Sequence, residues 1–98
     1  MIKRGVSLLG LQPQMAIAYA IACRIYANHD LVCRLTSGTE GKHGRHSHHY
    51  KGCAIDTGIR KLQRAFCRIL DAELEVALGS EFQVILESNH IHIEYDPA

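Results

Sequence analysis

The C-terminal stretch EFQVILESNHIHIEYDPA (residues 81–98) constrains the fold most, because its side chains alternate with a period of two. Such alternation is typical of β-strands, whose successive side chains point to opposite faces of a sheet. Ser88 and Asn89 interrupt the pattern and can form a two-residue turn. The stretch therefore predicts a β-hairpin, with one apolar set of side chains: Phe82, Val84, Leu86, Ile91, Ile93 and Tyr95.

The predicted turn also fixes which residues of the hairpin share a face. It places Leu86 opposite Ile91, Ile85 opposite His92 and Glu87 opposite His90, and cross-strand partners lie on the same side of a sheet. The face away from the apolar set is termed the chemical face. A strand that only meets solvent would more often carry Thr, Lys or Arg than two histidines beside carboxylates. The chemical face consists of Gln83, Ile85, Glu87, His90, His92 and Glu94.

The remaining elements are shorter or less regular. Pro13 suits the first position of a helix that runs to about Ala27. LVCRLT (31–36) and CAIDT (53–57) predict two short strands, and a second helix is expected after Gly58, ending at Gly79. The apolar positions of that helix are Ile59, Leu62, Phe66, Ile69, Leu70 and Ala77. The predicted fold class is α+β, a small antiparallel sheet with two helices packed on one face.

Length and charge exclude several classes of protein. The 98 residues suit one domain, spanning 1–98, and the 47% of apolar residues can supply its core. A formal charge of +1 argues against a strongly basic nucleic-acid module or a disordered tail. No apolar run approaches the roughly 18 residues typical of a membrane span.

Lys3 and Arg4 precede an apolar run, VSLLGLQPQMAIAYAIAC, that has some features of a signal peptide. Gln12-Pro13-Gln14 breaks the run, and helical spacing resumes after it, so a retained helix is expected. The four cysteines show no CxxC spacing and have apolar neighbours. They are expected to be reduced core residues, not ligands of a structural zinc.

Residues 38–51 contain three glycines and few apolar side chains, which predicts a long loop. A catalytic zinc needs three protein ligands, drawn from His, Asp, Glu and Cys, and an open position. If strand 53–57 lies beside the hairpin, His49, Asp56 and one of His90 and His92 can converge. The alternative is a histidine-rich loop that binds transition metals adventitiously.

Ser47, His49, Gly52, Ala54 and Asp56 fill the pattern SxHxxGxAxD, and His90-Ile91-His92 supplies a following HxH. This combination resembles the zinc peptidoglycan peptidases: D-alanyl-D-alanine carboxypeptidases, D-Ala-D-Ala dipeptidases, and phage endolysins that cut L-Ala–D-Glu or related bonds. The signalling domain of hedgehog shares their zinc fold. The resemblance covers roughly residues 31–96 and implies a hedgehog-like fold around a Zn²⁺ cofactor.

The resemblance implies that His49, Asp56 and His92 bind the zinc. Some related enzymes use Glu-x-x-His, and Glu87 and His90 match that spacing, so His90 remains an alternative third ligand, with His92 preferred. Glu87 is the expected general base, and His90 is expected to orient water or to stabilise the oxyanion. Ser47 is expected to fix the loop or a ligand by a hydrogen bond.

One departure concerns substrate binding. Many relatives carry an arginine shortly after Ser-Gly that grips a substrate carboxylate, whereas here Ser37-Gly38 is followed by Thr39-Glu40. Arg45, Lys42 or Arg34 could compensate. The departure argues against a strict carboxypeptidase, which must hold a free C-terminus.

The expected function is zinc-dependent hydrolysis of peptide bonds in peptidoglycan stem peptides, by an endopeptidase or carboxypeptidase of phage or prophage origin. The alternative is a catalytically inactive zinc-containing binding module of the same fold. The expected partner is the stem peptide, with no nucleic acid and no membrane span. Synthesis is expected in the cytoplasm, and a phage partner would release the enzyme to the cell wall.

Overall fold

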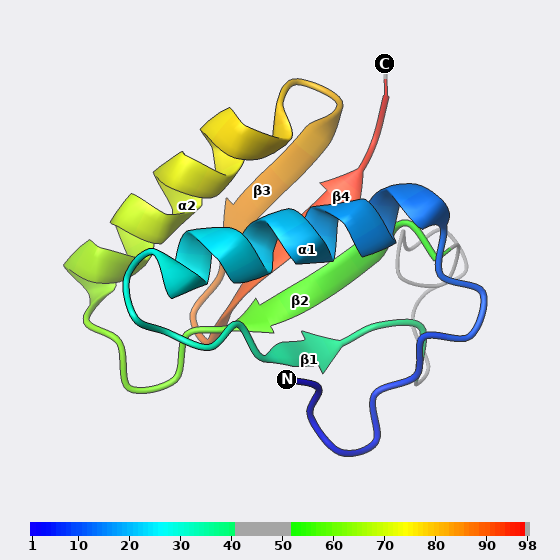
Figure 1. Ribbon diagram of the computed structural model, residues 1–98, viewed down its shortest axis with the longest axis horizontal. Helices are drawn as coiled ribbons and strands as arrows, with labels where there is room; N and C mark the ends of the chain where they lie inside the picture. Colours follow the sequence, from blue (N-terminus) through cyan, green and yellow to red (C-terminus); the bar gives the residue numbers. More distant parts are fainter. Residues whose placement is uncertain (41–51, 98) are drawn as a thin grey trace.

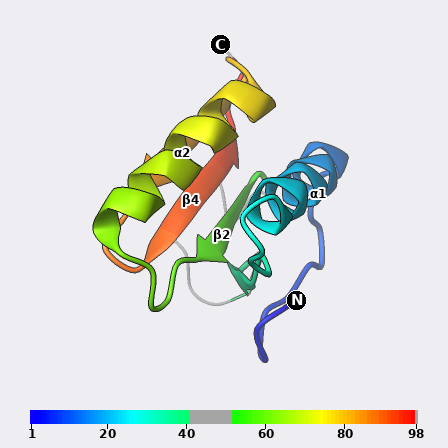
Figure 2. The same cartoon turned by 60° about the vertical axis from the view of Figure 1, so that its left-hand side comes forward.

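A computed structural model describes residues 1–40 and 52–97 of the chain. Two helices and four strands follow one another, and the strands form one antiparallel sheet in the order β1-β2-β4-β3. Figure 1 shows both helices lying across one face of this sheet, where α2 packs on β3, and Figure 2 shows the same arrangement turned so that α2 comes forward. The bounds of the elements are α1 Pro13–Ala27, β1 Leu35–Ser37, β2 Ala54–Gly58, α2 Arg64–Leu78, β3 Phe82–Leu86 and β4 His90–Tyr95. The predicted α+β class is confirmed.

The C-terminal hairpin has the register that the sequence predicts. Leu86 pairs with Ile91 and Ile85 with His92, and the Glu87 amide donates a 2.9 Å hydrogen bond to the His90 carbonyl at the turn. Ile91 and Ile93 are fully buried beneath the helices. Since the period is two, His90, His92 and Glu94 lie on the opposite side of β4.

The helices bury one stripe each against the sheet. Helix α1 contributes Met15, Ala18, Ala22 and Tyr26 to the core, and α2 contributes Cys67, Leu70 and Leu74. The Tyr26 hydroxyl lies 3.0 Å from both Thr57 Oγ1 and the Gly58 carbonyl oxygen, which joins α1 to the end of β2. This contact satisfies the buried Thr57 hydroxyl, which would otherwise cost free energy.

Two predicted boundaries were wrong. The first strand is shorter than 31–36, and the second helix begins at Arg64 instead of directly after Gly58. Residues 59–62 form a turn instead, closed by a hydrogen bond from the Leu62 amide to the Ile59 carbonyl, with Lys61 at a φ of 66°. Ile69, which the sequence placed among the apolar positions of this helix, is 50% exposed, because the stripe set by Cys67, Leu70 and Leu74 faces away from it.

None of the four cysteines, all of which lie in the described ranges, forms a disulfide, and Cys33 and Cys67 are buried. No helix in the described part of the chain is long and apolar enough to cross a membrane.

Candidate metal centre

The chemical face extends from the hairpin onto β2 because β2 pairs with β4. Asp56 lies directly opposite His92 in this pairing, and its Oδ1 is 2.9 Å from His92 Nδ1. The two side chains are 14% and 17% exposed, so both are largely removed from water. A residue from the middle of the chain and one from its C-terminal strand thus share one partly buried contact.

The second ring nitrogen of His92 contacts another carboxylate. His92 Nε2 lies 2.8 Å from Glu94 Oε1, and the Glu94 side chain is 11% exposed. The hydrogen bond to Asp56 raises the pKa of His92 above its usual value, burial lowers it, and the hydrogen bond to Glu94 raises it further. Two carboxylates therefore hold one imidazole ring by both of its nitrogens.

His90, two residues before His92 on β4, lies near the same Asp56 carboxylate. Its Nε2 is 3.7 Å from Asp56 Oδ1, and its Nδ1 is 2.6 Å from the side-chain oxygen of Asn89. Gly58 is the β2 residue opposite His90, and Ala54 is the one opposite Glu94. Ala54 is fully buried, and a Cβ atom at Gly58 would lie 3.3 Å from Thr36 Cγ2, so both positions accept only a small residue.

The spacing of these atoms can be compared with a zinc coordination shell. Two ligand atoms that share a tetrahedral zinc at bond lengths of ~2.0–2.1 Å lie about 3.3 Å apart. The distances from Asp56 Oδ1 to His92 Nδ1 and His90 Nε2, 2.9 and 3.7 Å, lie on either side of this value. The carboxylate and imidazole groups are also ligands that zinc accepts. Asp56 and either histidine therefore fit as two of the ligands.

The described residues do not contain a complete set of three metal ligands. Within 1–40 and 52–97, no group of three or more His, Cys, Asp or Glu side chains is arranged to hold a metal ion. The predicted ligand His49 lies outside those ranges, as do Ser47 and Arg45. The three-ligand site stays a prediction, with Asp56 and His92 brought together and His90 near them.

Glu87, the expected general base, lies at the hairpin turn with an exposed side chain. Its carbonyl oxygen accepts a 2.7 Å hydrogen bond from Arg64, and its amide bonds to His90. These contacts fix its backbone next to His90. The catalytic role of Glu87 stays a prediction.

Glu94 was placed on the chemical face by the sequence, which gave it no role. The available signal was the alternation itself, since HIHIE puts His92 and Glu94 on one side of a strand. Along that side His92 Nε2 and Glu94 Oε1 lie 2.8 Å apart. The carboxylate of Glu94 is the site residue that the sequence did not identify.

Glu40, at the place where many of the resembling peptidases carry arginine, has a different environment. Its carboxylate accepts hydrogen bonds from the Gly38 amide at 2.7 Å, the Ser7 amide at 3.1 Å and the Ser37 hydroxyl at 2.9 Å. Burial opposes ionisation, but these donors outweigh it and hold the pKa of Glu40 below its ordinary value. Glu40 therefore joins the N-terminal segment to the end of β1.

Comparisons with models of known protein families, with curated proteins and with solved structures return no match to this chain.

Proposed function

We propose that this chain is a zinc-dependent peptidase that hydrolyses peptide bonds in peptidoglycan stem peptides, of phage or prophage type. The fold would then be of the hedgehog and D-Ala-D-Ala-peptidase kind. The observation that carries the proposal is the pairing of Asp56 with His92 across β2 and β4, with donor atoms 2.9 Å apart. Both residues are ones that the SxHxxGxAxD and HxH patterns assign to the metal.

The surroundings of His92 add support that is independent of those patterns. Metal-binding histidines commonly donate their second ring N–H to a carboxylate, which fixes the tautomer and the ring orientation. Glu94 lies 2.8 Å from His92 Nε2 and is 9% exposed. With Nε2 held by Glu94, Nδ1, which contacts Asp56 Oδ1, is the nitrogen that would bind a metal shared with Asp56.

Each residue of the centre then has a defined task. Asp56, His92 and His49 would hold the zinc, which when bound lowers the pKa of a water and polarises the scissile carbonyl. Glu87 would accept the proton from the attacking water and pass it to the leaving amine. His90 would orient that water or donate to the oxyanion, and Asn89 fixes its ring by the contact at Nδ1.

The direct test compares cell-wall hydrolysis by the wild type, Asp56→Asn and His92→Ala with zinc present. Both variants should lose hydrolysis, because each removes a group that binds the metal. Asp96→Asn is a matched control, since Asp96 lies beyond β4 and contacts Gln83. Wild-type turnover in Asp56→Asn would refute the proposal.

One observation favours a second candidate, a zinc-containing binding module of the same fold without catalysis. The side chain of the expected base, Glu87, is exposed, and its recorded hydrogen bonds involve its backbone. Hydrolysis by the zinc-loaded wild type separates the two candidates, and Glu87→Gln tests the base. A peptidase should lose hydrolysis and retain zinc, and Glu75→Gln, on the exposed side of α2, should retain both.

A further inference from the structure

A cavity of about 930 Å³ opens at the end of the sheet where β2 finishes and β4 begins. Asp56 and His90 form part of its wall, so the cavity is continuous with the candidate metal centre. The turn at 59–62 and residues of β1 line the rest, including Thr36 and Ser37. A ligand in this cavity would lie directly beside the Asp56–His90 contact.

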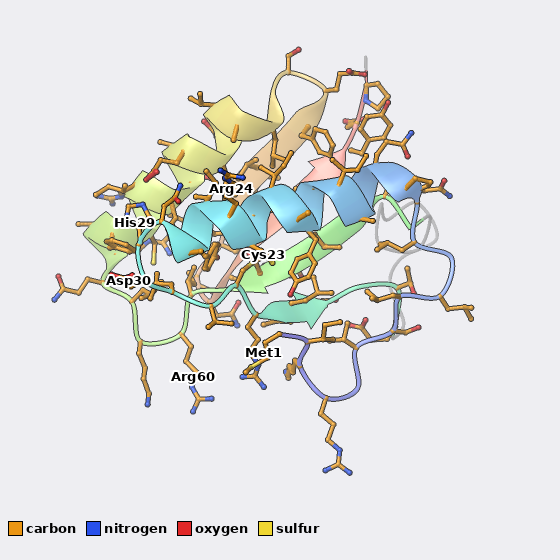
Figure 3. The ribbon with its side chains drawn as sticks, in the orientation of Figure 1. Met1, Cys23, Arg24, His29, Asp30 and Arg60 are labelled. Carbon is orange, nitrogen blue, oxygen red and sulfur yellow. The ribbon has the colours of Figure 1, made fainter. Side chains whose placement is uncertain are left out.

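The charged residues that line this cavity are mostly basic. Among its described lining residues five are basic, whereas Asp56 alone is acidic. Figure 3 shows Arg60 extending from the segment after β2, on the same side of the molecule as Met1. Because the whole chain carries a formal charge of only +1, this concentration of positive charge is local. The basic residues are Lys3, Arg34, Arg60, Lys61 and Arg64.

Arg34 provides a second, independent observation. Its Nε is buried and has no hydrogen-bond partner among the described residues. Its carbonyl oxygen accepts a 2.8 Å hydrogen bond from the Gly58 amide, which fixes the Arg34 backbone to the end of β2. A buried guanidinium donor without a partner is unfavourable. An anion in the cavity would supply that partner, and guanidinium binds carboxylates in a planar, two-point geometry.

We infer that this cavity binds a carboxylate of an acidic peptide, with Arg34 as the anchor. The inference rests on the proposed function, since it takes the peptide to be the substrate. Arg60, Lys61 and Lys3 contribute positive charge at the exposed rim. Arg64 already donates a hydrogen bond to the Glu87 carbonyl, so it is not counted among the residues that bind the peptide. The peptide would be fixed by its acidic group while a neighbouring peptide bond faces Asp56 and His90.

The test measures peptide binding to metal-free protein by calorimetry, so that no hydrolysis occurs. The probes are a synthetic stem tetrapeptide with free carboxylates and the same tetrapeptide with its carboxylates amidated. We expect the free form to bind at least about ten-fold more tightly, because the amidated peptide cannot form the charged hydrogen bond between its carboxylate and Arg34. Arg34→Gln should abolish this preference. Arg68→Gln, an arginine on the exposed side of α2 outside the cavity, should keep it.

Thermal unfolding of Arg34→Gln checks that this variant is folded. If Arg34→Gln does not fold, Arg60→Gln replaces it in the test: Arg60 lies at an exposed position, and its loss should weaken the preference for the free peptide. Equal binding of both peptides by the wild type, or an unchanged preference in both variants, would overturn the inference. Tighter binding of a short single-stranded oligonucleotide than of the free peptide would also overturn it. If the preference is present but zinc-loaded protein hydrolyses no stem peptide, the proposed function fails and the carboxylate site stands.

Discussion

Replacing Glu94 with Gln should weaken zinc binding, although Glu94 is not among the predicted ligands. The carboxylate accepts from His92 Nε2 at 2.8 Å and its side chain is 11% exposed, so water cannot easily replace it. Its negative charge makes the imidazole a stronger donor at Nδ1 and keeps the ring turned toward Asp56. Glutamine retains an oxygen that can accept the same hydrogen bond, but it lacks the charge.

The expected magnitude follows from the type of contact that is lost. Removing a residue that supports a metal ligand in this way typically weakens metal affinity 10–100-fold, or about 1.4–2.7 kcal/mol. Because the glutamine oxygen preserves the hydrogen bond, Glu94→Gln should fall near the ten-fold end of this range. Glu94→Leu removes the acceptor as well and should fall near the hundred-fold end.

Competition between the protein and a chromophoric zinc chelator at neutral pH measures this affinity. Glu75→Gln, a charge-matched change at an exposed position of α2, should bind zinc as the wild type does. Nitrogen NMR of His92 in the loaded protein should place its proton on Nε2. Unchanged zinc affinity in both Glu94 variants, or a proton on Nδ1, would refute the reasoning.

Three further changes test the fold by urea unfolding. Tyr26→Phe removes the hydroxyl that contacts Thr57 and the Gly58 carbonyl, and should cost about 1–3 kcal/mol of unfolding free energy; no loss would contradict the buried contact. Leu74→Ala, at a fully buried position of α2, should cost about 2–5 kcal/mol, and a loss far below this would place Leu74 outside the core. The pKa of Glu40 is lowered in the folded chain, so its contribution is present above its ordinary pKa of 4.5 and is lost as the pH falls through the lowered value. Glu40→Gln should therefore lose less stability on acidification than the wild type, and parallel pH profiles would contradict this.

The sequence predicted the parts of the fold that depend on neighbouring residues. The hairpin register was correct because Ser88 and Asn89 leave few ways to close a turn between two alternating strands. Helix α1 was correct at both ends, where Pro13 begins it and the Asn28-His29-Asp30 segment ends it. The start of α2 was wrong because residues 59–62 have apolar spacing compatible with a helix but form a turn, with Lys61 in the left-handed region.

The candidate centre depends on contacts that no local pattern contains. The sequence could place His92 and Glu94 on one face of β4, because alternation is local. It could not decide that Asp56 lies opposite His92, since β2 and β4 are joined only after helix α2 and strand β3 intervene. A register shifted by one residue would point Asp56 into the core beside the helices. The buried Ile55 and Thr57 prevent that shift, because it would expose both and bury a carboxylate instead. Packing on the helical side of the sheet thus fixes the chemistry on the other side.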